Sequence, residues 1–136
     1  MREILFRGKR IDNGEWVTGF YVHYDDTKDN HEDDCDYIVG IHTGKHFPFF
    51  EVIPETVGQY TGLTDKNGKK IFEGDIVERK RSDKTSYYQI CYDEGIASFI
   101  GLRGIGFTRF VYDSERFEVI GNIYDNSELI EGCEQV

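Results

Sequence analysis

Alternation of side chains along the chain is the feature that most constrains its fold. In EWVTGFYVHY, the residues Trp16, Thr18, Phe20, Val22 and Tyr24 occupy every second position, so they share one face of an extended strand. Similar alternation, rich in β-branched and aromatic residues, occurs in TSYYQICYD, IASFIGL, GFTRFVYD and RFEVIGNIY. This succession of short strands predicts a mainly β fold, a compact antiparallel barrel or sandwich.

Glycine dominates the connections between these strands, because the chain has 15 Gly and only two Pro. Asn13-Gly14 predicts a type I′ hairpin, since both residues of that turn need positive φ. The segment Tyr92–Ala97 predicts a second hairpin. We therefore expect tight glycine turns throughout.

Helical signals are few. Asn126 or Ser127 can cap a short C-terminal helix over residues 126–132, with Gly132 as its stop. A second short helix is compatible with residues 52–57 around Pro54.

The stretch QYTGLTDKNGKKIFEGDIVERK has the look of a phosphate-binding loop, with Lys69 and Lys70 after Gly68. A P-loop, however, ends in Gly-Lys-Ser/Thr and leads into a helix whose N-terminus faces the phosphate. Here the glycine leads into a strand instead. We predict a tight turn over residues 65–68, followed by a bend at Gly74 whose neighbour Asp75 accepts local backbone N–H bonds.

Three blocks of the sequence together resemble the YopX family: MREILFRGKRIDNGEWVTGF, VIPETVGQYTGLTDKNGKKIFEGDIV and FEVIGNIYDNSELI. They cover about half of the chain and span nearly its full length. The resemblance implies a mostly β fold, an origin in a phage or prophage and a cytoplasmic setting in the host bacterial cell. It brings no established activity and no catalytic residues.

The length of 136 residues fits one domain over residues 1–136, and the net charge of −10 is unevenly distributed. The run DDTKDNHEDDCD, residues 25–36, holds seven carboxylates and one Lys. We expect this run to be a solvated acidic loop, and its composition also fits disorder. The three cysteines are far apart and odd in number, which suits a reducing cytosol. No apolar run is long enough for a membrane span, so we expect no membrane association.

A metal site has candidate ligands around the acidic run, namely His31, Cys35, Asp36, His42 and His46. Thr43-Gly44-Lys45 between two of these histidines favours a turn over a helix, on which their spacing would align them. The simpler interpretation is an acidic loop and a strand with exposed histidines. We therefore predict no metal and no other cofactor, and rank a metal-dependent enzyme below a protein-binding and a nucleic-acid-binding function.

Catalytic patterns are likewise weak. There is no Gly-x-Ser-x-Gly motif, and Cys91 lies within a predicted strand as a small core or half-exposed residue. The carboxylate pairs Glu73–Asp75 and Asp93–Glu94 are typical of turns and surfaces. We predict that the protein is not an enzyme.

A nucleic-acid site has one candidate, a basic cluster close to tyrosines. It consists of Arg79, Lys80, Arg81, Lys84 and Tyr87. Small β-barrels bind single strands by combining a cationic groove with stacking aromatics. The alternative is a long charged hairpin loop whose tyrosines point into the core, and the acidic remainder of the surface favours it.

The function that these patterns favour is a non-enzymatic protein-binding module, an accessory protein of a phage or prophage. The first alternative is a small nucleic-acid-binding β-barrel that uses the basic cluster. The second is an acidic mimic of DNA that inhibits a host enzyme, with residues 25–36 reaching up to about 40 Å if extended. Because a small β protein covers unpaired edge strands by self-association, we also expect a homo-oligomer beside a host or phage protein partner.

Overall fold

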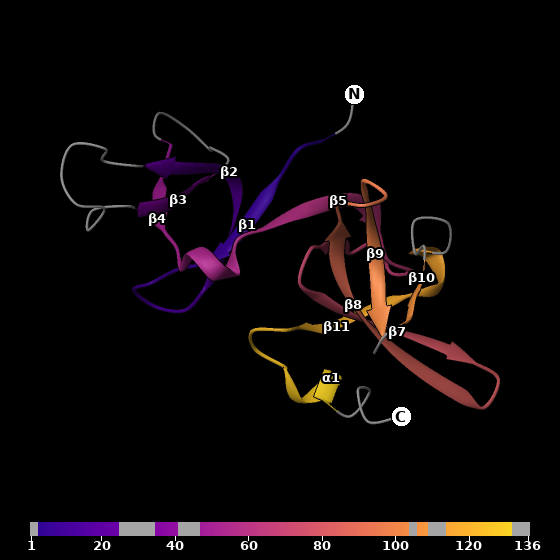
Figure 1. Ribbon diagram of the computed structural model, residues 1–136. Helices are drawn as coiled ribbons and strands as arrows, with labels where there is room; N and C mark the ends of the chain where they lie inside the picture. Colours follow the sequence, from indigo (N-terminus) through magenta and orange to yellow (C-terminus); the bar gives the residue numbers. More distant parts are fainter. Residues whose placement is uncertain (1–2, 25–34, 41–46, 104–105, 109–113, 132–136) are drawn as a thin grey trace. The chain divides into compact units, whose positions relative to one another are not determined.

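The computed structural model forms two compact units, Met1–Tyr60 and Thr61–Val136 (Figure 1). It describes residues 3–24, 35–40, 47–103, 106–108 and 114–131. Both units are mainly β, and every strand pairing with a defined register is antiparallel. The mainly antiparallel β fold expected from the alternation is thereby confirmed.

The first unit is one strongly curved sheet with strand order β4-β3-β2-β1-β5. Its elements are β1 (Phe6–Lys9), β2 (Trp16–Tyr24), β3 (Cys35–Gly40), β4 (Phe49–Glu51), the 3-10 helix η1 (Pro54–Thr56) and the start of β5 (Gly58–Thr64). The end of β1 returns to the end of β4 through a single bridge between Arg10 and Val52. Ile38 and Val52 are fully buried inside this curve.

The turn between β1 and β2 corrects the predicted type I′ hairpin. The hairpin exists, with Lys9 opposite Trp16, but six residues, from Arg10 to Glu15, connect the strands. Gly14 has a φ of 73°, whereas Asn13 keeps a negative φ. The Asn13 side chain instead accepts the N–H of Glu15 at 2.9 Å, an arrangement that stabilises a longer loop ending in a left-handed glycine.

The second unit is built on a five-stranded sheet with order β10-β9-β8-β7-β11, while β6 pairs with β5. Its elements are β6 (Lys70–Phe72), β7 (Asp75–Arg81), β8 (Lys84–Asp93), β9 (Ser98–Arg103), β10 (Gly106–Thr108), the 3-10 helix η3 (Ser114–Arg116), β11 (Glu118–Asn122) and α1 (Glu128–Glu131). Within the described residues neither sheet order closes into a barrel. The core consists of Ile71, Val77, Ile90 and Phe117, all fully buried.

The turn predicted at residues 65–68 is confirmed. Gly68 has a φ of 82°, and its N–H donates to the Asp65 carbonyl at 3.0 Å. The Asp65 side chain accepts the N–H of Asn67 at 2.8 Å and of Lys69 at 2.9 Å. The next expected bend is also present, because Gly74 has a φ of 91° and the Asp75 carboxylate accepts the Phe72 N–H at 2.7 Å. The stretch that looks like a phosphate-binding loop is therefore a tight turn followed by a strand.

The remaining local predictions have mixed outcomes. The short C-terminal helix is confirmed as α1, and η1 occupies the segment around Pro54. The hairpin expected at residues 92–97 is confirmed, with Asp93 opposite Ser98. The hairpin between β7 and β8 is not the long loop that we expected, because Arg81 lies opposite Lys84 and only two residues connect them.

The acidic run needs one correction. Residues 25–34 lie outside the described residues, but Cys35 and Asp36 begin β3 rather than belonging to a loop. Asp36 is only 5% exposed. The expectation of one domain over residues 1–136 stays a prediction, and the two compact units describe how that chain is divided internally.

Candidate functional site

The most unusual surface of the first unit is the outer face of its sheet. Strand register places Phe20 opposite Val39 and Val39 opposite Phe49, so these three residues form a row across β2, β3 and β4. Val22 and Tyr37 form the next row. We call this surface the aromatic face and define it by Phe20, Val22, Tyr24, Tyr37, Val39 and Phe49.

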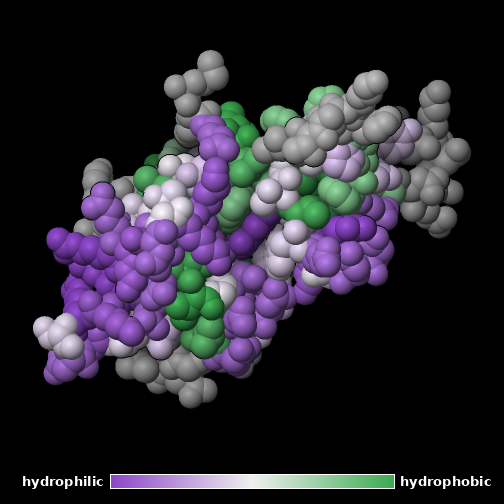
Figure 2. All heavy atoms as spheres, turned by 180° about the vertical axis from the view of Figure 1, so that it is seen from behind, coloured by the Kyte–Doolittle hydropathy of each residue, from purple (hydrophilic) through white to green (hydrophobic). Residues whose placement is uncertain are grey.

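The aromatic face is open to solvent. Phe20 is 55% exposed, Tyr24 57% and Phe49 65%, and Val22 is also exposed. Figure 2 shows one side of the molecule, on which green hydrophobic side chains lie among purple hydrophilic ones. An outer strand face is normally polar, because an antiparallel sheet buries only one side. A group of exposed aromatic side chains on adjacent strands is typical of a binding surface.

Aromatic and cationic contacts order parts of this face. The rings of Tyr37 and Phe49 meet edge-on, with centroids 6.4 Å apart. Further along β2, the guanidinium of Arg7 lies 4.8 Å from the centre of the Trp16 ring. The hydrogen bond with the Cys35 side chain and the negative charge of its thiolate form raise the pKa of the Tyr37 hydroxyl.

The opposite face of the same two strands carries a polar cluster around Asp36. The Tyr21 hydroxyl donates to Asp36 Oδ1, and His23 Nδ1 lies 2.9 Å from the same oxygen. Burial, the hydrogen bond to Asp36 and its negative charge raise the pKa of Tyr21 to about 12. Because Tyr21 and His23 lie on β2 and Asp36 lies on β3, the cluster links the two strands that carry most of the aromatic face.

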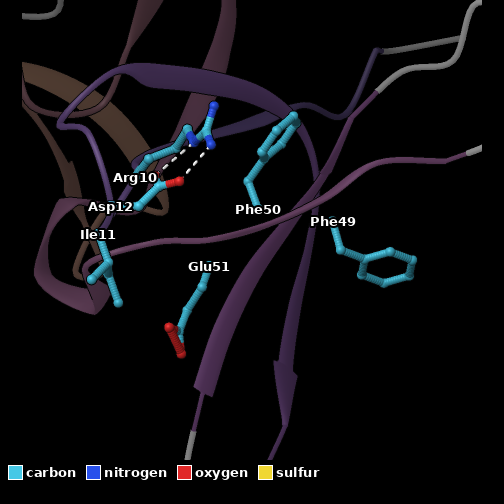
Figure 3. A pocket seen from close by; sticks show the side chains of 6 residues that line it. All are labelled: Arg10, Ile11, Asp12, Phe49, Phe50 and Glu51. Carbon is cyan, nitrogen blue, oxygen red and sulfur yellow. Dashed lines mark hydrogen bonds and ion pairs between the residues drawn. The ribbon is translucent and has the colours of Figure 1, made fainter.

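A pocket lies where the β1–β2 turn approaches β4 (Figure 3). It has a volume of about 180 Å³ and is lined by Arg10, Ile11, Asp12, Phe49, Phe50 and Glu51. Two hydrogen bonds join Arg10 to the Asp12 carboxylate, from Nε at 2.9 Å and from Nη2 at 2.6 Å. The Phe50 ring lies 4.7 Å from the same guanidinium, whereas the Phe49 ring points away from it in Figure 3.

The basic cluster predicted for nucleic acid is divided by the strand alternation. Arg79 is 7% exposed and lies 5.7 Å from the Phe117 ring, so it belongs to the interior of the second unit. Lys80 is exposed and pairs with Glu78 at 3.4 Å. Arg81 and Lys84 are exposed beside the two-residue turn, and Tyr87 is half-buried opposite Glu78. The five residues therefore do not form one continuous surface, and their binding to nucleic acid stays a prediction.

The metal candidates are only partly described. His31, His42 and His46 lie outside the described residues, while Cys35 and Asp36 occupy adjacent positions on β3 and so project to opposite faces. Within the described ranges, no group of three or more His, Cys, Asp or Glu side chains is placed to hold a metal ion.

The catalytic candidates Cys91 and Asp93 lie in β8. Cys91 is half-buried in β8, and burial together with the charges of Glu73 and Asp93 raises the pKa of its thiol. The carboxylate of Asp93 accepts the Gly95 N–H at 2.8 Å and so shapes the β8–β9 turn.

No helix among the described residues is long and apolar enough to cross a membrane.

Sequence reasoning placed Phe20, Val22 and Tyr24 on one strand face but did not show that this face is exposed. A signal was present, because Tyr21 on the opposite face is also aromatic and a strand with apolar residues on both faces has one side left to cover. The pocket at β4 had no sequence signal, since its walls come from segments almost forty residues apart.

Comparisons with known proteins agree with the fold. The structure of protein EF1440 from Enterococcus faecalis is similar, with a TM-score of 0.55 and 23% sequence identity over 96% of this chain and 99% of that chain. At this identity the likeness concerns the fold alone. A search among curated proteins gives no significant match. The family model described as YopX protein matches residues 5–131, nearly the whole sequence, and the chain therefore belongs to the YopX family.

Proposed function

We propose that this protein is a non-enzymatic protein-binding module that docks a partner protein on the aromatic face. The single observation that carries the proposal is the row Phe20–Val39–Phe49 with its exposed aromatic side chains. We further propose that the module is an accessory protein of a phage or prophage that acts in the cytoplasm of the host cell. The partner is then a host or phage protein.

The size of the aromatic face supports a protein partner. At about 200 Å² for each aromatic side chain, the exposed parts of Phe20, Tyr24 and Phe49 present roughly 350 Å². A standard interface buries about 800 Å² on each side, and somewhat more than half of that area is apolar. The aromatic face would therefore supply most of the apolar centre of such an interface, and surrounding polar residues would form its rim.

The charge of the molecule also favours a protein over a nucleic acid. The chain carries a net charge of −10, and phosphate binding requires a concentrated cationic surface. An aromatic surface that is not strongly cationic can instead be buried against apolar groups of a partner protein, which removes water from both surfaces. A second candidate function is self-association through the same face. Light scattering at several protein concentrations measures such self-association directly.

The test is a pull-down from a lysate of phage-infected host cells, with and without nuclease. The bait is the unaltered protein or the double variant Phe20→Glu with Val22→Glu, which places two charges on the aromatic face. The matched control is Ile96→Glu, since Ile96 is equally apolar and 42% exposed but lies in the β8–β9 turn. Circular dichroism establishes that all three proteins are folded.

A protein that the unaltered chain and Ile96→Glu retain after nuclease, and that the double variant loses at least tenfold, supports the proposal. Equal retention by all three baits refutes the role of the aromatic face. Retention that disappears with nuclease shifts the function to nucleic acid. In that case Arg81→Glu should abolish binding, and its salt dependence should be steep.

A further inference from the structure

The outer edge of β4 has backbone groups that point away from the sheet. Gly40 donates its N–H to the Pro48 carbonyl, and Val52 donates to the Asp36 carbonyl. These are hydrogen-bonded pairs of the β3–β4 ladder, so the residues between them alternate. The N–H and C=O of Phe49 and Glu51 therefore point away from β3, toward the free side of the strand.

Half of this edge is already used by the first unit itself. The Ile11 N–H donates to the Glu51 carbonyl at 3.1 Å, and the Ile53 N–H donates to the Lys9 carbonyl at 2.8 Å. Beyond Ile11, the β1–β2 turn leads the chain away from the edge of β4. Among the described strands none lies beyond β4, so the edge from the Glu51 N–H to Phe49 is open to an added strand.

The pocket at β4 lies directly beside this open segment (Figure 3). Its 180 Å³ is close to the volume of a cavity that holds one benzene-sized group, so it has room for one aliphatic or aromatic side chain. Ile11 and Phe49 supply apolar walls and are 54% and 65% exposed. The backbone edge and the pocket are thus adjacent, as recognition of an extended peptide requires.

The charges around the pocket determine which net charge a bound peptide should carry. Arg10 and Asp12 neutralise each other through their two hydrogen bonds. Glu51 is exposed, and no cation among the described residues pairs with its carboxylate. The local charge is therefore negative, in agreement with the net charge of the chain.

We propose that β4 binds an extended basic segment of the partner as an added strand, with one apolar side chain in the pocket and a Lys or Arg beside Glu51. This inference rests on the proposed function and deepens it, because Phe49 belongs both to the aromatic face and to the pocket. A second copy of the chain is a less suitable occupant, since two molecules of charge −10 repel each other.

The test uses fluorescein-labelled short peptides of alternating Lys and Val, with fluorescence anisotropy as the readout. A second peptide has the same side chains but carries N-methyl groups at alternate residues, in each of the two registers, and so loses backbone donors without losing charge. The protein variants are Glu51→Gln, which removes the charge, and Glu51→Pro, which also removes the outward N–H. Edge positions whose N–H faces solvent accept Pro, and thermal melting verifies the fold. Glu55→Gln is the matched control for an exposed carboxylate of the same unit.

We expect the Lys-Val peptide to bind the unaltered chain and Glu55→Gln equally. Glu51→Gln should weaken binding several-fold, and Glu51→Pro and the better-placed N-methylated peptide should weaken it about tenfold or more. The inference is overturned if N-methylation has no effect in either register, or if no binding occurs up to about 1 mM. If Glu51→Pro still captures the partner from lysate while the double variant on the aromatic face does not, the proposed function stands and the edge inference fails.

Discussion

Replacing Asp65 tests how the second unit is held together. Its carboxylate is almost fully buried and accepts three backbone N–H groups. Two of them, from Asn67 and Lys69, belong to its own turn and share Oδ1. The third comes from Val119 in β11 at 2.9 Å and uses Oδ2. One side chain thus joins a local turn to a strand that follows 54 residues later.

The expected loss of stability on replacing Asp65 follows from these three hydrogen bonds. Hydrogen bonds to a charged acceptor contribute about 1.5–3 kcal/mol each, and they are not fully additive. Asp65→Ala leaves all three donors without a partner, so we expect a loss of about 3–6 kcal/mol in the free energy of unfolding. Asp65→Asn keeps an oxygen for the turn but presents an amide NH₂ to the Val119 N–H, and should cost about 1–3 kcal/mol.

The assay is equilibrium unfolding in urea followed by far-UV circular dichroism. Fluorescence of Trp16, the one tryptophan of the chain, reports the first unit separately. The control is Asp83→Asn in the exposed β7–β8 turn, which should change stability by less than about 0.5 kcal/mol.

The pH dependence supplies an independent check. Burial raises the pKa of Asp65, but the bonds from Val119, Lys69 and Asn67 together outweigh burial and leave the pKa below its ordinary value. A carboxyl group whose pKa is lowered by folding stabilises the protein above the pKa of the unfolded chain, and this contribution is lost as the pH falls through the folded-state value. The difference between the unaltered protein and Asp65→Asn should therefore shrink below about pH 4. Equal stability of Asp65→Ala and Asp83→Asn would refute the reasoning.

Three further predictions concern the core, the Asp36 cluster and a thiol. Phe117→Ala should lower the free energy of unfolding by about 3–5 kcal/mol in urea, because it empties the largest fully buried position, and a loss below about 1 kcal/mol would contradict the core described above. Because folding raises the pKa of Tyr21 to about 12, its contribution to stability should persist below pH 10 and disappear as the pH rises toward 12. Tyr21→Phe should abolish that alkaline change in a urea series, and an unchanged profile would count against the bond to Asp36. Cys91, whose thiol pKa is raised, should react with iodoacetamide more slowly in the folded protein at pH 8 than in urea, as mass spectrometry of the labelled peptide measures; equal rates would show that the thiol is not shielded.

Much of the fold follows from the sequence because its signals are local. Alternation specifies strands wherever side chains must project to two faces, and it placed β2 and β8 correctly. Asp65-Lys66-Asn67-Gly68 specifies its turn because the Asp side chain and the left-handed glycine act within five residues. The type I′ prediction for Asn13-Gly14 failed because a dipeptide does not set the length of the loop around it. Here the Asn13 side chain stabilises the longer form.

What only the tertiary structure decided is which face of each strand meets solvent. Phe20, Val22 and Tyr24 alternate as Tyr88 and Ile90 do, yet the first three are exposed and Ile90 is fully buried. Arg79, which reads as a surface cation, is enclosed because β11 and η3 bring Phe117 against it. Burial depends on how sheets curve and on segments distant in sequence, and no local pattern records that. The sequence by itself therefore determined the strands and turns of this protein, while its candidate binding surface exists only in the folded chain.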